Sequence, residues 1–241
     1  MLSVAEAEKI VLETVPALPA EDCPLEHAHG RVLRADLRAD RDLPPFDRVT
    51  LDGYALRRAA WVAGARRFRI EGTQAAGMIP LKVKAEDGCI EVMTGAVLPA
   101  GADCVVPYED AAREGSHMAV SAAVKVDAGQ AVHHRGSDYP ANAVVVPAGA
   151  RLGGREIAVA AACGCATVTV TTLPAIAVVA TGDELVEVSA SVAPHQIRRS
   201  NDYALRASLI QAGYPRVERF HLRDMRHEIV AGLRRLITGF D

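Results

Sequence analysis

Aromatic residues are scarce in this 241-residue chain, where Phe, Trp and Tyr make up 4% of the sequence. Few rings are therefore present to stack on nucleic-acid bases. The formal net charge is -3 and no long basic run occurs, so the charge gives no reason to expect nucleic acid as a partner. Ala and Val dominate the hydrophobic half of the residues, which predicts an aliphatic core.

Long hydrophobic runs are missing too. The longest one, residues 157–166, falls far short of the ~20 residues that span a bilayer, so no membrane association is expected. No secretory signal is visible, because the first residues form a capping box, Ser3-Val4-Ala5-Glu6, that predicts an amphipathic helix ended by Pro16. Five cysteines without framework spacing fit a reducing compartment, and the expected location is cytoplasmic.

Several familiar catalytic signatures are lacking. There is no GxGxxG or Walker-type loop, which argues against dinucleotide binding and common nucleotide hydrolysis, and no Ser/His/Asp pattern for acyl transfer. The Cys163-Gly164-Cys165 segment lies in an apolar run and predicts buried thiols. Two histidine pairs have no partner at zinc-like spacing and are expected to be exposed: His27 with His29, and His133 with His134.

The pattern along the chain predicts an α/β multidomain protein. Residues 1–41 read as a helix followed by extended chain, and residues 139–172 mix short strands with a helix after Gly154, so the two segments together are expected to form one discontinuous linker lobe. Residues 42–138 carry short strands separated by Gly/Pro turns, for example at 89–93 and 104–107, and predict a β-rich insertion lobe.

Residues 173–241 have a clearer pattern. A continuously apolar strand at 175–180 is followed by a helix from Ser200 to Gly213, a strand at 217–222 and a second helix. The order β-α-β-α is the opening of a doubly wound sheet. In the second helix the apolar residues are expected to face inward: Ile229, Val230, Leu233, Leu236 and Ile237. Two parallel strands bury little surface, so this lobe is expected to be truncated, as a fragment or as a sheet completed by another chain.

The first chemical candidate is the segment 43–55, where Asp47 and Asp52 lie beside prolines and a glycine. Stiff prolines and a permissive glycine can hold Asp52 in a fixed place. The alternative is a turn with a solvated aspartate. The Thr94-Gly95 turn offers a hydroxyl and backbone N–H groups that suit an oxyanion, although most such turns only connect strands.

Two further segments carry carboxylates. Asp138 ends the run Arg135-Gly136-Ser137-Asp138, for which a surface turn with an exposed ion pair is the alternative. The run Thr181-Gly182-Asp183-Glu184 follows a predicted parallel strand, at the edge where α/β sheets place ligands. Asp183 and Glu184 could bind Mg²⁺, Asp224 follows the next strand at the same edge, and Ser200-Asn201 opens a helix whose N–H groups attract anions. Ordinary capping of the βα loops is the alternative.

These segments together resemble the MoeA family of molybdopterin molybdenumtransferases, whose module also occurs in gephyrin. Residues 44–55 resemble the family segment P-x-F-D-N-S-A-M-D-G-Y-A. Five more short motifs follow in the family's order: Met93–Ala96, Gly101–Val106, Arg135–Asp138, Thr181–Leu185 and Ser200-Asn201. The resemblance therefore extends over essentially the whole chain.

The resemblance implies an elongated homodimer with a β-rich lobe, a discontinuous lobe and a doubly wound, MogA-like molybdopterin-binding lobe. It implies Mg²⁺-dependent insertion of molybdate into adenylylated molybdopterin with release of AMP, and a MogA-like adenylyltransferase as pathway partner. The active cleft would lie between the β-rich lobe of one subunit and the doubly wound lobe of the other.

Carried onto this sequence, the resemblance assigns catalytic roles to Asp52, Asp138, Glu184 and Asp224, with Mg²⁺ held by Asp52, Glu184 and Asp224. The residues expected to bind substrate are Thr94, Gly95, Thr181, Gly182, Asp183, Ser200 and Asn201.

The sequence also departs from the family pattern. The family's N-S-A-M is Arg48-Val49-Thr50-Leu51 here, and an arginine beside Asp47 could pair with it or meet a phosphate. Ser137 stands where many relatives have Glu. A Ser-Gly-Gly loop expected downstream is absent, so the isolated chain is expected to have little insertion activity. A non-catalytic scaffold that binds molybdopterin or dimerises is the alternative function, and an unrelated nucleotide-processing α/β protein is a weaker third.

Overall fold

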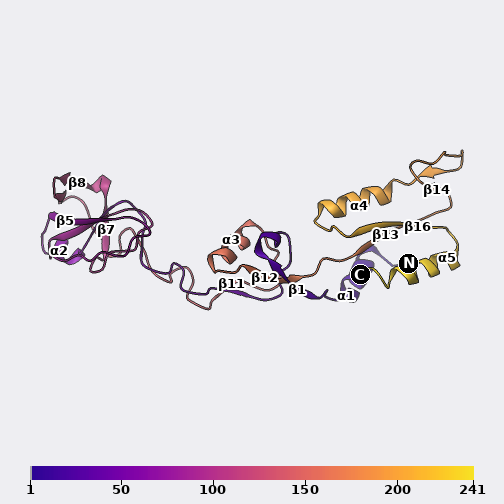
Figure 1. The fold of residues 1–241 in the computed structure, drawn as a ribbon, viewed down its shortest axis with the longest axis horizontal. Helices are drawn as coiled ribbons and strands as arrows, with labels where there is room; N and C mark the ends of the chain where they lie inside the picture. Colours follow the sequence, from indigo (N-terminus) through magenta and orange to yellow (C-terminus); the bar gives the residue numbers. More distant parts are fainter. Residues whose placement is uncertain (1) are drawn as a thin grey trace. The chain divides into compact units, whose positions relative to one another are not determined.

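The computed structural model describes residues 2–241, which divide into two compact units (Figure 1). The β unit comprises Leu37–Val146, and the α/β unit comprises the chain up to Asp36 together with Pro147–Asp241. A β-rich segment is thus inserted into the other unit, with limits at 37 and 146 where the sequence suggested 42 and 138. The further division of the α/β unit into a linker lobe and a separate lobe of residues 173–241 stays a prediction.

The β unit is built on a six-stranded sheet in the order β7-β4-β6-β5-β9-β8. The β5–β6 pair is parallel and the other neighbours are antiparallel. The strands are β4 (Gly53–Leu56), β5 (Arg67–Gln74), β6 (Gly88–Val92), β7 (Cys104–Pro107), β8 (Ala111–Glu114) and β9 (His117–Val120). The strands predicted at 89–93 and 104–107 are therefore confirmed as β6 and β7.

Both faces of this sheet are buried. Alternate residues of a strand point to opposite faces, and Tyr54 and Leu56 belong to one apolar cluster while Ala55 belongs to another. The first cluster also holds Trp61 from the short helix α2 (Arg58–Val62). The remaining elements of the unit are η2 (Tyr108–Asp110) and two short antiparallel pairs, β2 (Leu37–Arg38) with β11 (Val144–Val146) and β3 (Arg48–Val49) with β10 (Val132–His133).

The N-terminal part of the α/β unit contains the predicted helix. Helix α1 (Val4–Thr14) begins with the Ser3–Glu6 capping box in both directions and stops just before Pro16. None of its residues is buried, so the apolar face of α1 is exposed. Strands β1 (Ala20–Pro24) and β12 (Thr167–Thr171) pair antiparallel, next to η1 (Leu25–His27) and the predicted helix α3 (Gly154–Ala162).

The C-terminal part has the predicted β-α-β-α order. Strands β13 (Ile176–Thr181) and β16 (Val217–Leu222) pair in parallel, and helices α4 (Asn201–Gln211) and α5 (Arg226–Leu236) lie on opposite sides of them (Figure 1). A short parallel pair, β14 (Leu185–Val186) with β15 (Ile197–Arg198), precedes α4. None of the helices between residues 2 and 241 combines the length and hydropathy needed to traverse a bilayer.

The predicted inner face of α5 is wrong in part. Leu236 is buried, but Val230, Leu233 and Ile237 are 40%, 43% and 76% exposed. The helix contacts β16, and a sheet of two strands is too narrow to cover its whole apolar stripe. Helix periodicity therefore identified the apolar stripe but not the surface that covers it.

Candidate functional site

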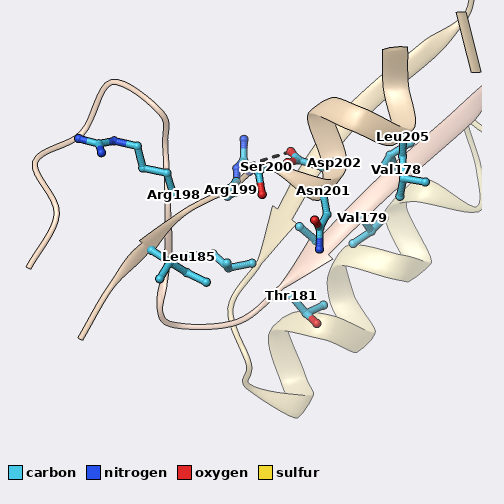
Figure 2. A pocket seen from close by; sticks show the side chains of 12 residues that line it. Val178, Val179, Thr181, Leu185, Arg198, Arg199, Ser200, Asn201, Asp202 and Leu205 are labelled. Carbon is cyan, nitrogen blue, oxygen red and sulfur yellow. Dashed lines mark ion pairs between the residues drawn. The ribbon is translucent and has the colours of Figure 1, made fainter. Parts of the chain in front are cut away.

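A cavity of about 270 Å³ lies at the carboxyl end of β13, where β15 and the amino end of α4 meet it (Figure 2). Three residues predicted from the sequence line it: Thr181, Ser200 and Asn201. Its other walls combine apolar side chains of Val178, Val179, Leu185, Ile197 and Leu205 with the polar residues Arg198, Arg199 and Asp202. This is the sheet edge where α/β folds bind ligands.

The polar groups of the cavity differ in how they are engaged. Arg198 extends away from Thr181 and Asn201 in Figure 2, and its Nη2 donates to the Ala190 carbonyl at 3.3 Å. Ser200 is the N-cap of α4 but makes no side-chain capping hydrogen bond. The first N–H groups of a helix have no partners within it, so the amino end of α4 can donate to an anion.

A network of buried ion pairs adjoins these groups, and the sequence analysis did not predict it. Arg199 and Asp202 are 6% and 2% exposed, and Arg199 Nε lies 3.6 Å from Asp202 Oδ2. Arg219 Nη1 lies 3.2 Å from the same oxygen, and Arg199 also pairs with Glu187. Buried charges are tolerated when they are paired. Because Arg199 follows β15 and Asp202 lies in the first turn of α4, their ion pair holds these two elements together.

One signal could have revealed this network. Arg199 and Asp202 are three residues apart across the start of a predicted helix, which is a spacing at which opposite charges meet. The participation of Arg219 could not be seen, because it comes from the following strand. Its guanidinium lies 3.3 Å above the ring of Tyr203, so it is held by both an ion pair and an aromatic ring.

The acidic loop after β13 is shaped by Gly182. This residue has a φ of 140°, and a Cβ added to it would lie 2.7 Å from Glu184 Oε2, so the Glu184 carboxylate is folded over the glycine. Asp183 Oδ1 accepts from the Arg223 side chain at 3.3 Å and from the Asp224 amide at 3.4 Å. The predicted meeting of Asp183 and Asp224 at one sheet edge is therefore observed.

The carboxylate oxygens of this loop are of the ligand type that Mg²⁺ prefers. Asp183, Glu184 and Asp224 are exposed carboxylates, and Mg²⁺ is usually bound by one or two carboxylates together with phosphate oxygens and water. Among residues 2–241, no three His, Cys, Asp or Glu side chains are grouped so that they could hold a metal ion between them. The carboxylates of this loop alone therefore do not form a metal site.

In the β unit, the structure brings Asp52 and Thr94 together. Asp52 precedes β4 and Thr94 follows β6, which are neighbouring strands. The backbone N–H and the hydroxyl of Thr94 donate to Asp52 Oδ1 at 2.6 and 2.7 Å. These hydrogen bonds, the one from the hydroxyl first, hold the pKa of Asp52 below its usual value. Asp52 is therefore an exposed carboxylate that Thr94 holds in place and whose ionised form is favoured.

Gly53 explains why this segment needs a glycine. A Cβ at this position would lie 2.1 Å from the Val106 carbonyl oxygen of the neighbouring strand β7. Gly95, in the turn after Thr94, has a φ of 87°, which also favours glycine. Gly53 thus allows β4 and β7 to approach closely, and Gly95 allows the turn that follows Thr94.

Asp138 lies in a different group of side chains of the β unit. His133 Nε2 is 2.9 Å from Asp138 Oδ1, and Arg48 Nη2 is 3.1 Å from His133 Nδ1. Asp47, which the sequence suggested as a partner of Arg48, instead accepts from the Arg135 amide at 2.8 Å. Of the histidines expected to be exposed, His27, His29 and His134 are exposed, whereas His133 is half-buried, with its side chain 30% exposed.

The predicted site residues thus form separate groups in the two units. Thr181, Ser200 and Asn201 line the cavity of the α/β unit beside Asp183, Glu184 and Asp224, whereas Asp52, Thr94 and Asp138 belong to the β unit. A magnesium ion shared by Asp52, Glu184 and Asp224 would need residues of both units, and it stays a prediction.

Comparison with known proteins agrees with the motifs. A family profile described as the MoeA N-terminal region (domain I and II) matches residues 2–164. A molybdopterin molybdenumtransferase from Synechocystis is 37% identical over 230 residues, which is 95% of this chain and 59% of that protein. The enzyme of the same name from Bacillus subtilis is 33% identical over 195 residues, covering 78% of this chain and 45% of that one.

The structural comparison gives the same result. The crystal structure of the molybdopterin biosynthesis MoeA protein from Pyrococcus horikoshii matches with a TM-score of 0.87 at 28% identity, over 100% of this chain and 65% of that one. The chain therefore spans less than two thirds of these relatives. Because the family profile covers more than half of the chain and the fold agrees throughout it, the chain belongs to the MoeA family.

Proposed function

We propose that this chain acts in molybdenum cofactor biosynthesis as a molybdopterin molybdenumtransferase. Its substrates would be molybdate and adenylylated molybdopterin, and AMP would be released. The name shared by its curated relatives supports the reaction class. The observation that carries the proposal is the cavity at the carboxyl end of β13, where polar side chains and a helix amino end adjoin an acidic loop.

The cavity suits a ligand with one apolar face and one anionic end. Val178, Val179 and Leu205 can contact a flat ring system, and ligand sites usually combine such walls with a few fixed polar groups. Thr181 ends β13, and Asn201 begins α4, whose first N–H groups have no partners within the helix. These donors would bind phosphate oxygens.

Carboxylates require a cation in order to act on anionic substrates. Asp183, Glu184 and Asp224 follow the carboxyl ends of β13 and β16. We assign Mg²⁺ to Glu184 and Asp224, with Asp52 as the third carboxylate and substrate oxygens as the remaining ligands. Bound Mg²⁺ would clamp the phosphate oxygens and offset the charge of departing AMP. Asp52, held by Thr94, and Asp138, held by His133, are the carboxylates that the β unit brings to the reaction. A homodimer would bring together the two units of different subunits, and a MogA-like adenylyltransferase would supply the substrate.

Ligand binding by the chain itself is the first test. Binding of molybdopterin and its adenylylated form would be followed by pterin fluorescence, with and without Mg²⁺. Asn201→Leu should weaken binding roughly 10-fold, because one hydrogen bond to a charged group is lost. Gln211→Leu, at the other end of the same helix, removes an amide outside the cavity and should bind like the wild type. Binding unaffected by Asn201→Leu would show that the cavity is not the pterin site.

Catalysis is tested separately. A chimera in which this chain replaces the matching segment of the Synechocystis enzyme would be assayed for AMP release and molybdenum insertion. Asp52→Asn and Glu184→Gln should each abolish turnover, whereas full activity in both variants would remove the assigned roles. Pterin binding without AMP release, by the chain and by the chimera, would favour the non-catalytic scaffold.

A further inference from the structure

His133 is held between side chains from two separate segments. Strands β3 and β10 pair antiparallel with His133 opposite Arg48, which places the guanidinium beside the imidazole ring. Arg48 Nη2 lies 3.1 Å from Nδ1, and Asp138 Oδ1 lies 2.9 Å from Nε2. Both ring nitrogens therefore have a partner, and the side chain is 30% exposed.

Arg48 decides which ring nitrogen carries the proton. A guanidinium has only N–H donors and no acceptor, so the Nδ1 atom must accept and stays unprotonated while this contact exists. The proton of the neutral ring therefore lies on Nε2, from which it is donated to Asp138 Oδ1. The two hydrogen bonds run in one direction, from Arg48 through His133 to Asp138.

The backbone around Asp138 is fixed independently of this chain of hydrogen bonds. The Asp138 amide donates to the Leu43 carbonyl, and the Gly136 amide donates to the Pro44 carbonyl, both at 2.9 Å. Arg135 Nε lies 2.7 Å from Asp42 Oδ2 on the same segment. These bonds set where the Asp138 backbone lies, and His133 sets how its carboxylate is turned.

We propose that His133 is a positioning residue for Asp138, and that Arg48 imposes the tautomer in which His133 does this. The Nε2–H group occupies Oδ1 and leaves Oδ2 as the oxygen open to a substrate. The resembled family segment has Asn where this chain has Arg48, so the arrangement is a feature of this sequence. The positioning of Asp138 for the reaction rests on the proposed function, which gives Asp138 its role. The tautomer of His133 rests on geometry alone.

The tautomer is tested by nuclear magnetic resonance on the chain with ¹⁵N-labelled histidine, with the His133 signals assigned from their loss in His133→Gln. In the wild type, Nε2 should be protonated and Nδ1 should not. Arg48→Lys keeps a donor and should keep this pattern, whereas Arg48→Met should give a mixture of tautomers. A proton on Nδ1 in the wild type, or an unchanged single tautomer in Arg48→Met, would overturn the assignment to Arg48.

Positioning is tested by AMP release in the chimera described above. His133→Leu removes the donor and should lower kcat roughly 10-fold with little change in KM. His133→Gln keeps an N–H group at a similar reach and should restore most of the activity. His117→Leu, on β9 of the same unit, is the matched control and should leave kcat unchanged. Far-ultraviolet circular dichroism of each variant confirms that it is folded.

The outcomes separate the two proposals. If Asp138→Asn is inactive but His133→Leu is as active as the wild type, Asp138 matters and His133 does not position it. If Asp138→Asn is fully active, Asp138 has no role in the reaction and its positioning by His133 fails as a proposal with it. The tautomer result is unaffected by either outcome, because it is measured without substrate.

Discussion

Replacing Arg199 with methionine should destabilise the α/β unit, because Asp202 would lose one of its two cationic neighbours. Asp202 is 2% exposed, and its Oδ2 lies 3.6 Å from Arg199 Nε and 3.2 Å from Arg219 Nη1. Methionine approximates the apolar stem of arginine but has no N–H donor. The substitution therefore removes the charge and the side-chain hydrogen bond to Glu187 with little loss of packing volume.

The size of the effect follows from what remains around Asp202. Removing one partner of a buried ion pair commonly costs ~3–5 kcal/mol, since the other charge stays buried. Here Arg219 remains, and the amino end of α4 favours a negative charge in its first turn. Glu187, the other partner of Arg199, has a side chain 56% exposed and can be hydrated. We therefore expect a loss of about 2 kcal/mol in the unfolding free energy of this unit.

The single tryptophan allows the two units to be followed separately. Trp61 is buried in the β unit, so its fluorescence reports the unfolding of that unit. Amide hydrogen exchange in α4 and β13 reports the α/β unit. In Arg199→Met, the α4 amides should lose protection at lower urea concentration while the Trp61 transition stays in place. Arg234→Met, at an exposed position of α5, is the control and should change stability by less than about 0.5 kcal/mol.

A double variant shows whether the pair itself is responsible. Arg199→Met combined with Asp202→Leu leaves neither charge buried, so its loss should be at least about 1 kcal/mol smaller than the sum of the single losses. Unchanged protection of α4 in Arg199→Met, or strict additivity of the two substitutions, would refute the reasoning that Asp202 depends on Arg199.

Two further predictions concern the site residues. Thr94→Val should raise the pKa of Asp52 toward its ordinary 3.8, measured by carbon NMR titration. Because the folded pKa is lowered, the stability that Asp52 contributes is present above the unfolded pKa and is lost as pH falls through the folded pKa. In the Thr94→Val variant, Asp52 should contribute less to this pH-dependent stability. Gly182→Ala should displace the Glu184 carboxylate and weaken Mg²⁺-dependent pterin binding, whereas Gly213→Ala, with a φ of 98° and open space around it, should show similar backbone strain without that loss. An unchanged Asp52 titration, or equal binding by the two alanine variants, would contradict these predictions.

Much of the local structure could be predicted because its causes lie within a few residues. The Ser3–Glu6 capping box and Pro16 delimit α1, and both ends are found where expected. The apolar run at 175–180 and the strand at 217–222 pair in parallel, as the β-α-β-α order indicated. Gly213 follows the end of α4 with a φ of 98°, which few other residues tolerate.

The candidate site could be predicted only in part. The positions of Asp52 and Asp183 followed from motifs, and the β-α-β-α order placed Asp224 at the same sheet edge as Asp183. The contact between Asp52 and Thr94 did not follow, because Thr94 lies 42 residues further along the chain. The sequence offered Asp47 as a partner of Arg48, and the β3–β10 pairing gave it His133 instead. A contact between distant segments depends on strand register, which neighbouring residues do not specify.

The sequence by itself determined the membership in the MoeA family, the order of helices and strands, and the carboxylates and turns that carry the chemistry, because each of these is written in short runs of residues. Only the tertiary structure decided that Arg199, Asp202 and Arg219 form a buried network and that His133 joins Arg48 to Asp138. The physical reason is that burial and hydrogen-bond partners depend on which surfaces meet once the chain has folded. Local periodicity and composition determine which face of a helix or strand is apolar, but not which other element packs against that face.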